Sequence, residues 1–315
     1  MTAKHRTAGF KGYSVQFSPF SDQLLAAATS ANFGLVGNGR LSILNALPGT
    51  EGISPRQQYD TQDGLFDLSW NEAHENQIAT ASGDGSIKLW DITLNGLPIA
   101  RWHEHRREVM GIEWNYIAKS TFLSSSWDGS VKLWNPATPQ SLRTFTEHTG
   151  CVYGSTWSPS QFDQFATCSE DKTIKLWSVN EPNGKSLATF GGHVDQVLSL
   201  DWNKYKPEQL VTSSVDRTIK IWDIRNPRGQ VAMFGPFEFS VRRVKFSPFS
   251  PNFIATAGYD MSASVWDVRN GTVVYVHDLH KEFVFGIDWS LFHSGLMATC
   301  SWDEQVHLFQ VPVVK

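Results

Sequence analysis

Histidine, a hydroxyl residue and aspartate recur together in this 315-residue sequence at a fixed spacing. A His lies 23 residues before an Asp, and a Ser or Thr lies four residues before the same Asp. These are the side chains of a nucleophilic triad, but a nucleophile is usually made once, so the repetition indicates a fold requirement and no enzyme is expected. The sets that also have a Trp six residues beyond the Asp are His105, Ser124, Asp128 and Trp134; His148, Thr167, Asp171 and Trp177; and His193, Thr212, Asp216 and Trp222.

Two other features could suggest a binding site, but neither meets the requirements of a known motif. Residues 184–186 (Gly-Lys-Ser) match the end of a phosphate-binding loop, yet Val179 stands where that motif needs its first Gly. Cys151, Cys168 and Cys300 are too scattered for a disulfide framework or a CxxC metal site. We therefore expect no cofactor and no metal.

The unit that positions these residues is clearest at residues 124–134, SSSWDGSVKLW. A strand with Ser or Thr leads into a tight Asp turn, and a second strand ends on an aromatic residue six positions after that Asp. The successive steps of 44, 43, 45, 44 and 43 residues match the roughly 40 to 45 residues of a four-stranded propeller blade. The turn residues are Asp84, Asp128, Asp171, Asp216, Asp260 and Asp303.

A second marker, a strand that ends in an aromatic residue followed by Ser or Asn, counts seven units. Alternation such as VMGIEW at 109–114 is typical of strands with one covered face. The sequence predicts an all-β, seven-bladed β-propeller as a single domain over residues 1–315. The approximate blades are 10–60, 61–103, 104–147, 148–192, 193–236, 237–279 and 280–315 plus 3–9.

The first blade and the N-terminus depart from the repeat. Its second strand is expected at 24–30, its turn at 37–39 and its third strand at 41–44, with an insertion from 47 to 55. Arg6 to Phe10 resembles the outer strands of later blades, although no blade precedes it. We expect the N-terminal strand to complete the last blade, because this closes the ring and removes a free sheet edge.

Composition limits the partners and the location. Hydrophobic residues make up 41% and include 13 Trp, which is enough for a large core. The formal charge of −4 predicts no nucleic-acid binding. No apolar signal segment and no membrane-spanning stretch are found, so the sequence predicts a cytosolic protein without direct membrane insertion.

Two positions in each blade are expected to face the central opening, where a propeller displays its loops. One is the residue before the turn Asp, and the other flanks the first apolar position of the innermost strand. Aromatic and acidic residues recur there, and they suit an amphipathic, cationic helix. Packing on neighbouring blades and ordinary solvated charges are the competing interpretations. The candidates are Asp63, Phe66, Glu108, Met110, Trp127, Tyr153, Glu170, Asp195, Gln196, Tyr259, Phe285 and Trp302.

The repeated sets resemble the structural tetrad of the WD-repeat propeller family, His, Ser or Thr, Asp and Trp. In such a tetrad, buried polar groups satisfy one another instead of costing about 1 to 3 kcal/mol each. His280, Thr299 and Asp303 form a fourth set that ends on Phe309. Thr61 and Phe237 replace the His of repeats two and six, so those blades should depend more on packing.

A narrower resemblance rests on GYSVQFSPF, NFGLVGNGRLSIL, DGLFDLSW, NKY at 203–205, VRRVKFSPF, YDMS at 259–262 and EFVFGIDWS. These segments are similar to the peroxisomal receptor family for type 2 targeting signals, the peroxin-7 family, from about Gly12 to Phe309. The resemblance implies a cytosolic receptor that cycles to the peroxisome. It implies cargo such as 3-ketoacyl-CoA thiolase, a co-receptor peroxin and a docking complex at the peroxisomal membrane.

The resemblance also assigns roles to the candidate residues. The signal of this family is a nonapeptide of the form Arg-Leu, five residues, His-Leu, which as a helix places apolar residues on one face. Aromatic side chains such as Trp127 and Tyr259 would form the floor and walls for that face. Glu108, with Asp195 or Glu170, would pair with the signal's Arg and His. The alternative is that Arg242, which lies among these acids, neutralises one of them instead.

Two other classes stay open. WDxR sequences end at Arg225 and Arg269, as in some substrate adaptors of cullin ubiquitin ligases, although Trp-Asp is common at this point of any WD repeat. A generic scaffold, like a G-protein β subunit, predicts no special aromatic rim.

Overall fold

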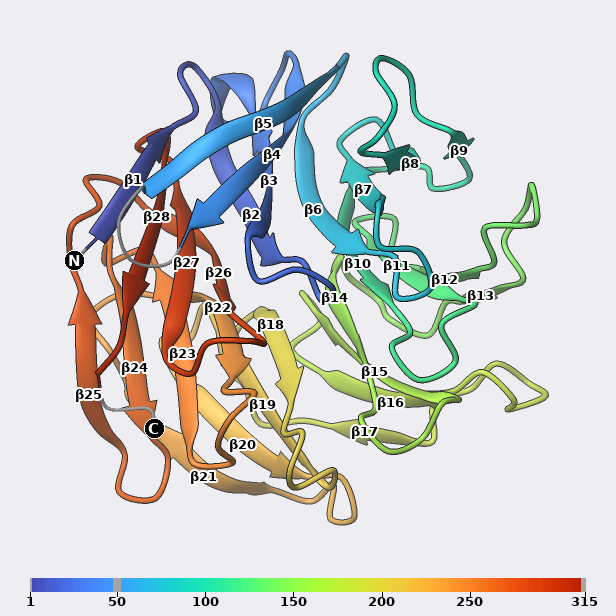
Figure 1. The fold of residues 1–315 in the computed structure, drawn as a ribbon. Helices are drawn as coiled ribbons and strands as arrows, with labels where there is room; N and C mark the ends of the chain where they lie inside the picture. The colour runs from blue at the N-terminus through green and yellow to red at the C-terminus, as the bar shows by residue number, and fades with distance from the viewer. Residues whose placement is uncertain (1, 48–51, 313–315) are drawn as a thin grey trace.

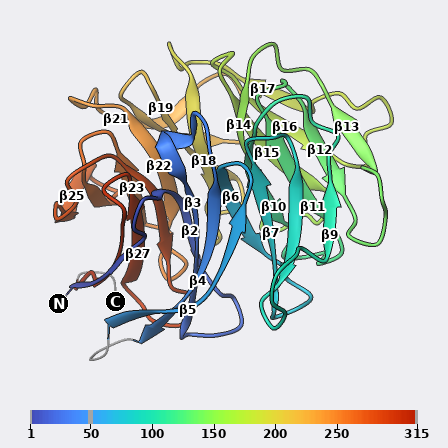
Figure 2. The same ribbon diagram turned by 90° about the horizontal axis from the view of Figure 1, so that it is seen from above.

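The computed structural model describes residues 2–47 and 52–312, which form a ring of seven four-stranded antiparallel sheets (Figure 1). The predicted seven-bladed propeller is therefore confirmed. The sheets follow one another in chain order, so the colour runs round the ring from blue to red, and Figure 2 shows the same ring turned by 90°. Residues 48–51, part of the insertion predicted at 47–55, lie outside the described residues.

Blades one to four each run from an inner to an outer strand along the chain. Their strands are β2 (Lys11–Phe17), β3 (Leu24–Ser30), β4 (Gly39–Leu47) and β5 (Gly52–Thr61); β6 (Leu65–Trp70), β7 (Gln77–Ser82), β8 (Ile87–Asp91) and β9 (Ala100–Trp102); β10 (Val109–Trp114), β11 (Phe122–Ser126), β12 (Val131–Trp134) and β13 (Arg143–Phe145); and β14 (Val152–Trp157), β15 (Gln164–Ser169), β16 (Ile174–Ser178) and β17 (Ala188–Phe190).

Blades five to seven follow the same order. Blade one differs by a one-turn 3₁₀ helix, η1 (Ala31–Gly34), between β3 and β4. Their strands are β18 (Val197–Trp202), β19 (Gln209–Ser214), β20 (Ile219–Asp223) and β21 (Gln230–Phe234); β22 (Val241–Phe246), β23 (Phe253–Gly258), β24 (Ala263–Asp267) and β25 (Thr272–His277); and β26 (Val284–Trp289), β27 (Leu296–Ser301) and β28 (Gln305–Gln310), completed by β1 (Thr2–Arg6).

The apolar core lies between neighbouring blades. Leu133 of blade three, for example, packs in one cluster with Trp157 and Trp177 of blade four. Each sheet packs against a neighbouring sheet on both of its faces. Burying these aromatic side chains therefore holds adjacent blades together through the hydrophobic effect. The repeat of Trp in the sequence thus marks the joints of the ring.

Carboxylates on the innermost strands also join successive blades. Asp67 accepts a hydrogen bond from the Ile112 backbone N–H at 3.1 Å, and Asp288 accepts one from that of Phe17 at 2.9 Å. Because a buried carboxylate is costly unless donors surround it, these bonds fix how each inner strand lies against the next. The bond from Phe17 to Asp288 joins the first blade to the last.

The N-terminal strand closes the last blade, as predicted. β1 pairs antiparallel with β28, with Thr2 opposite Phe309 and Arg6 opposite Gln305. The segment proposed for this strand, Arg6 to Phe10, was wrong, because residues 7–10 form a turn. Glu304 fixes that turn by accepting hydrogen bonds from Gly9 N–H and from the side chains of Arg6 and Lys11.

Candidate functional site

The repeated His, hydroxyl, Asp and Trp residues form hydrogen-bonded chains inside their blades. In blade three, His105 Nδ1 lies 2.9 Å from Asp128 and its Nε2 lies 2.7 Å from the Ser124 hydroxyl, which accepts from Trp134 Nε1 at 2.8 Å. Blades four and five repeat this geometry, at His148, Thr167, Asp171 and Trp177 and at His193, Thr212, Asp216 and Trp222.

These hydrogen-bonded chains have a structural role, because their polar groups are buried and already paired with one another. Burial raises the pKa of Asp128, but hydrogen bonds from His105 and Ser130 outweigh it and hold that pKa below its ordinary value. Ser124 is fully buried, and its hydroxyl oxygen already serves His105 and Trp134. The hydroxyl therefore has no open path to a substrate.

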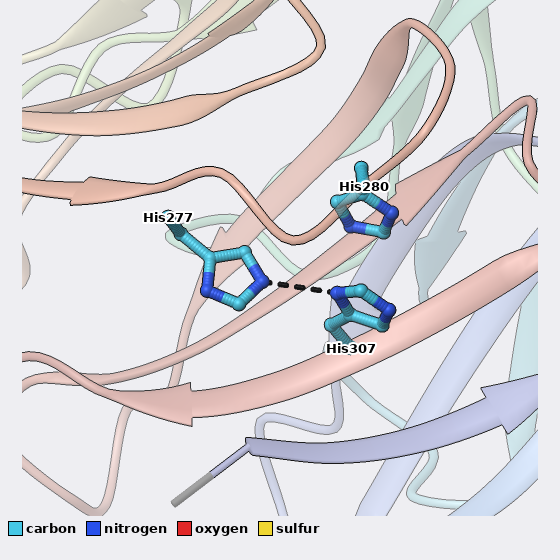
Figure 3. Close-up of side chains that lie close together, drawn as sticks. All are labelled: His277, His280 and His307. Carbon is cyan, nitrogen blue, oxygen red and sulfur yellow. Dashed lines mark hydrogen bonds between the residues drawn. The ribbon is translucent and has the colours of Figure 1, made fainter.

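Three buried histidines meet where the outer strand of blade six leads into blade seven, a group that the sequence spacing did not reveal (Figure 3). His277 Nε2 and His307 Nδ1 are 2.9 Å apart, while the rings of His280 and His307 stack at 3.8 Å with an interplanar angle of 10°. His280 also uses both nitrogens on Asp303 and Thr299. Lone pairs of stacked rings run parallel instead of converging, so this arrangement is a packed network rather than a three-histidine metal site.

The two predicted positions of each blade lie side by side at one end of the ring. The residue before the turn Asp donates its backbone N–H to a carbonyl at the start of the innermost strand, as from Trp127 to Glu108 at 3.0 Å and from Trp302 to Phe283 at 3.0 Å. The same bond joins Glu170 to Cys151 and Tyr259 to Ser240. This recurring bond places both series of side chains at the same end.

An aromatic cluster fills the middle of this end. It combines six of the predicted residues with the buried Tyr13 and the partly buried Phe283. Phe285 and Trp302 are in close contact, with ring centroids 4.6 Å apart, and Tyr259 lies 5.5 Å from Phe285. Tyr153 lies outside the cluster, 6.4 Å from Trp127. The aromatic cluster consists of Tyr13, Phe66, Met110, Trp127, Tyr259, Phe283, Phe285 and Trp302.

Tyr13 is the central member that the sequence reasoning missed. Its ring contacts those of Phe66, Phe285 and Trp302, with centroids 5.0, 5.4 and 5.8 Å apart. Burial raises the pKa of its hydroxyl far above the ordinary value. A signal existed, because Tyr13 precedes Phe17 by four residues, as Phe66 precedes Trp70.

The loop at residues 31–38 of blade one stands beside the aromatic cluster. Phe33 packs on Trp302 at 5.3 Å, and Leu35 and Val36 are 88% and 70% exposed. Asn32 and Phe33 have φ of 48° and 58°, a strained region for residues other than Gly. Gly34 is required here, since a Cβ would lie 2.7 Å from the Phe66 ring.

The predicted acids surround the cluster, but each already has a local partner. Asp63 and Asp195 accept hydrogen bonds from the next backbone N–H, and Glu170 accepts one from Cys151 N–H at 3.1 Å. Glu108 lies 3.6 Å from Arg107, whose guanidinium is 5.6 Å from the Trp127 ring. All four carboxylates keep unused lone pairs and are only partly buried.

Arg242 is more deeply buried than the acids, whereas Gln196 is partly buried as they are. Arg242 is buried, donates to the Leu198 carbonyl at 3.2 Å and lies 5.2 Å from the Phe285 ring. Burial lowers its pKa. Within the described ranges, no carboxylate is within ion-pair distance of Arg242, so the expectation that it neutralises a rim acid was wrong. Gln196 accepts a hydrogen bond from the Tyr153 hydroxyl at 2.7 Å.

The arginine of each WDxR sequence forms an ion pair with the Asp of the same sequence. Arg225 pairs with Asp223 and Arg269 pairs with Asp267, each through two guanidinium nitrogens. Both arginines remain exposed at the side of the ring, but two guanidinium nitrogens of each already donate to that Asp and are not free to bind a partner protein. The ubiquitin-ligase interpretation gains no support from this geometry.

A seven-bladed ring with these internal hydrogen-bonded chains defines the class of WD-repeat β-propellers. The chain belongs to the WD-repeat family: the family model "WD domain, G-beta repeat" matches residues 54–91, 96–135, 139–178, 184–223 and 230–267, more than half of the chain. The WD40 β-propeller domain of Doa1 has the same fold, with a TM-score of 0.83 over 99% of this chain and 96% of that one at 20% identity.

Curated relatives are similar over shorter segments. The chain is 51% identical over 106 residues to the peroxisomal targeting signal 2 receptor of Komagataella phaffii, covering 34% of this chain and 28% of the relative. It is 42% identical over 143 residues to that of Saccharomyces cerevisiae (45% and 38%) and 37% identical over 155 residues to that of Homo sapiens (49% and 47%). Each alignment thus spans less than half of the relative. None of the helices in the described ranges is long and apolar enough to cross a membrane.

Proposed function

We propose that this protein is a receptor for type 2 peroxisomal targeting signals and that the aromatic cluster binds the signal as an amphipathic helix. The observation that carries the proposal is the cluster itself, in which aromatic side chains from five blades meet at the end of the ring where the loops lie. The names of the relatives, each a targeting signal 2 receptor, support the same conclusion.

The chemistry of the rim suits such a helix. The apolar face of the helix packs on Trp127, Tyr259 and Trp302, which are only partly buried, while Phe285 and Tyr13 form the floor below. Large aromatic side chains in a central pocket are the residues that most often dominate binding energy at interfaces. Partly exposed aromatic walls of this kind, above a buried aromatic floor, are not required by the propeller itself.

The acids select the cationic side chains of the helix. Arg107 attracts the carboxylates of both Glu108 and Glu170: it lies 3.6 Å from Glu108, and a backbone N–H hydrogen bond, helped by the Arg107 charge, lowers the pKa of Glu170. A signal arginine would compete with Arg107 for Glu108, and the charge-assisted bonds it forms would reject a helix without that charge. Asp63 and Asp195 extend the acidic rim to blades two and five.

In this proposal, the receptor acts together with other proteins. Cargo such as 3-ketoacyl-CoA thiolase would be bound in the cytosol, joined by a co-receptor peroxin and delivered to a docking complex at the peroxisomal membrane. Leu35 and Val36 lie beside the cluster and are exposed, so they supply an apolar contact for a protein that closes over the bound helix.

Fluorescence anisotropy with a labelled nonapeptide, Arg-Leu, five residues, His-Leu, tests the proposal with and without the co-receptor. We expect binding that is lost when the peptide Arg is changed to Ala and when Glu108→Arg reverses the rim charge. Glu75→Arg, at an exposed turn beyond the far ends of the inner strands, is the matched control and should bind normally. Unchanged affinity in Glu108→Arg would remove the role of Glu108, and a folded protein that binds no signal under any condition would contradict the receptor function.

A further inference from the structure

A cavity of about 440 Å³ opens on blade six, beside the segment 237–240 that leads into its innermost strand. It is lined by Phe237, Asp260, Ser262, Ser264, Trp266 and Val276, among others. No member of the aromatic cluster lines it, and its outer wall belongs to β25, the outermost strand of blade six. It is therefore a site separate from the proposed signal-binding surface.

The cavity coincides with two replacements in blade six, at the positions that carry His and Lys in blades three to five. The residue four positions after the turn Asp is Lys in blades two to five, and Lys132 donates to Glu104 at 3.1 Å and to Thr144 at 3.0 Å. In blade six this residue is Ser264. The tetrad His is replaced by Phe237, whose ring packs on Trp266 at 5.0 Å.

Asp260 is consequently the turn Asp without its usual donors. In blade three, Asp128 accepts from His105, from Arg106 N–H and from Ser130. Among the described residues, Asp260 accepts hydrogen bonds only from the N–H and hydroxyl of Ser262, and it is exposed. Within residues 2–47 and 52–312, no cation lies within ion-pair distance of its carboxylate.

The charge and shape of the cavity fit a basic side chain with an aliphatic stem. Its described lining residues include two carboxylates, Asp260 and Glu238, and no Lys, Arg or His. Trp266, Val273 and Val276 supply apolar walls, and the two valines are 42% and 49% exposed. Long basic side chains pack their stems on such walls while the charged end reaches an acceptor.

We propose that this cavity binds a lysine or arginine side chain of a partner polypeptide. The partner's side chain takes the place of the missing His and Lys, with its charge on Asp260 and Ser262 and its stem against Trp266 and Val276. Glu238 at the edge attracts the same charge, and exposed Phe239, at 46%, offers a contact for the neighbouring apolar residue of the partner. The cavity is thus a second docking point, independent of the signal peptide.

Immobilised pentapeptides provide the probe. One pool has Arg or Lys at the centre, the matched pool has Gln, and the other positions are drawn from Ala, Leu, Val and Ser. We expect the full-length protein to prefer the basic pool at least tenfold. Trp302→Ala, a change in the aromatic cluster, should leave this preference intact and so distinguishes the cavity from the signal-binding surface.

Two variants locate the binding. Asp260→Asn removes the charge at an exposed position, and the pair Phe237→His with Ser264→Lys installs the residues that blades three to five carry. We expect both to lose at least tenfold in affinity for the best basic peptide, measured by anisotropy, while their thermal midpoints stay at or above that of the parent protein. Equal binding of the two pools, or undiminished binding by folded Asp260→Asn, would overturn the proposal, because the peptides would then bind elsewhere or without regard to charge.

Discussion

The Tyr13 hydroxyl donates a hydrogen bond of 2.6 Å to the backbone carbonyl of Phe33. This bond joins the inner strand of blade one, at the centre of the aromatic cluster, to the strained loop at 31–38. The Lys11 ammonium lies over the Phe33 ring, 4.8 Å from its centroid. Strain at Asn32 and Phe33 persists only where neighbouring contacts hold the backbone in place, and Tyr13 supplies one of them.

Tyr13→Phe should therefore loosen the loop without emptying the aromatic cluster. The change leaves a carbonyl without its donor, at a cost of about 1 kcal/mol, and keeps the ring. Hydrogen exchange of the amides at 32–38 should become faster. Tyr116→Phe removes a comparable hydroxyl, bonded to the Trp157 carbonyl at 2.9 Å, and should not change exchange in this loop. Equal exchange in Tyr13→Phe and the parent protein would show that the bond does not restrain the loop.

Trp302→Ala should weaken signal-peptide binding more than it weakens the fold. Its ring contacts those of Tyr13, Phe33, Phe283 and Phe285 at the exposed end of the ring. A central aromatic residue contributes about 2 kcal/mol or more to an interface, which corresponds to a loss of roughly 30-fold in affinity. Phe292→Ala removes an aromatic residue that is 46% exposed and lies outside the cluster, and it should bind normally in the same anisotropy titration. If both variants bind alike, the aromatic cluster is not the binding surface.

The fold was predictable because its determinants repeat. Six turn aspartates and seven strand-ending aromatic residues give the number of blades, and the fixed offsets from each Asp identify the residues that hydrogen-bond inside them. Tyr13 was missed because blade one has no turn Asp from which to count. The burial of Arg242 and the position of the Phe237 ring depend on packing between blades, which local spacing does not determine.

The tetrads should contribute to stability only where they are complete. His105→Ala removes one hydrogen-bond partner from each of Asp128 and Ser124, which keep their bonds to Ser130 and Trp134, and this loss should cost about 1 to 3 kcal/mol. Asp260→Ala removes the equivalent turn Asp from a blade without the His and should change the free energy of unfolding by about 0.5 kcal/mol or less. Thermal midpoints of the two variants measure the difference. A larger loss in Asp260→Ala would contradict the idea that blade six depends on packing.

Acid should destabilise the protein through two buried histidines, His277 of blade six and His307 of blade seven. Burial, then the charges of His280 and Lys4, lower the pKa of His277 to about 4, and burial together with His280, His277 and Lys4 lowers that of His307 to about 3. The charges of Asp278 and Asp303 act in the opposite direction but are outweighed. Both histidines are thus neutral in the folded protein over a range in which the unfolded chain, with a His pKa near 6.5, binds protons.

The sign of the effect follows from this difference in bound protons. Between pH 6.5 and about 4 the unfolded state binds more protons than the folded state, so the free energy of unfolding falls as the pH falls, by up to about 1.4 kcal/mol per pH unit for each histidine. Urea unfolding at pH 7.0, 6.0 and 5.0 measures the slope. The pair His277→Phe and His307→Gln should flatten it, since blades three and four carry Phe at the position of His277. Identical slopes in the variant and the parent protein would place the acid sensitivity elsewhere in the ring.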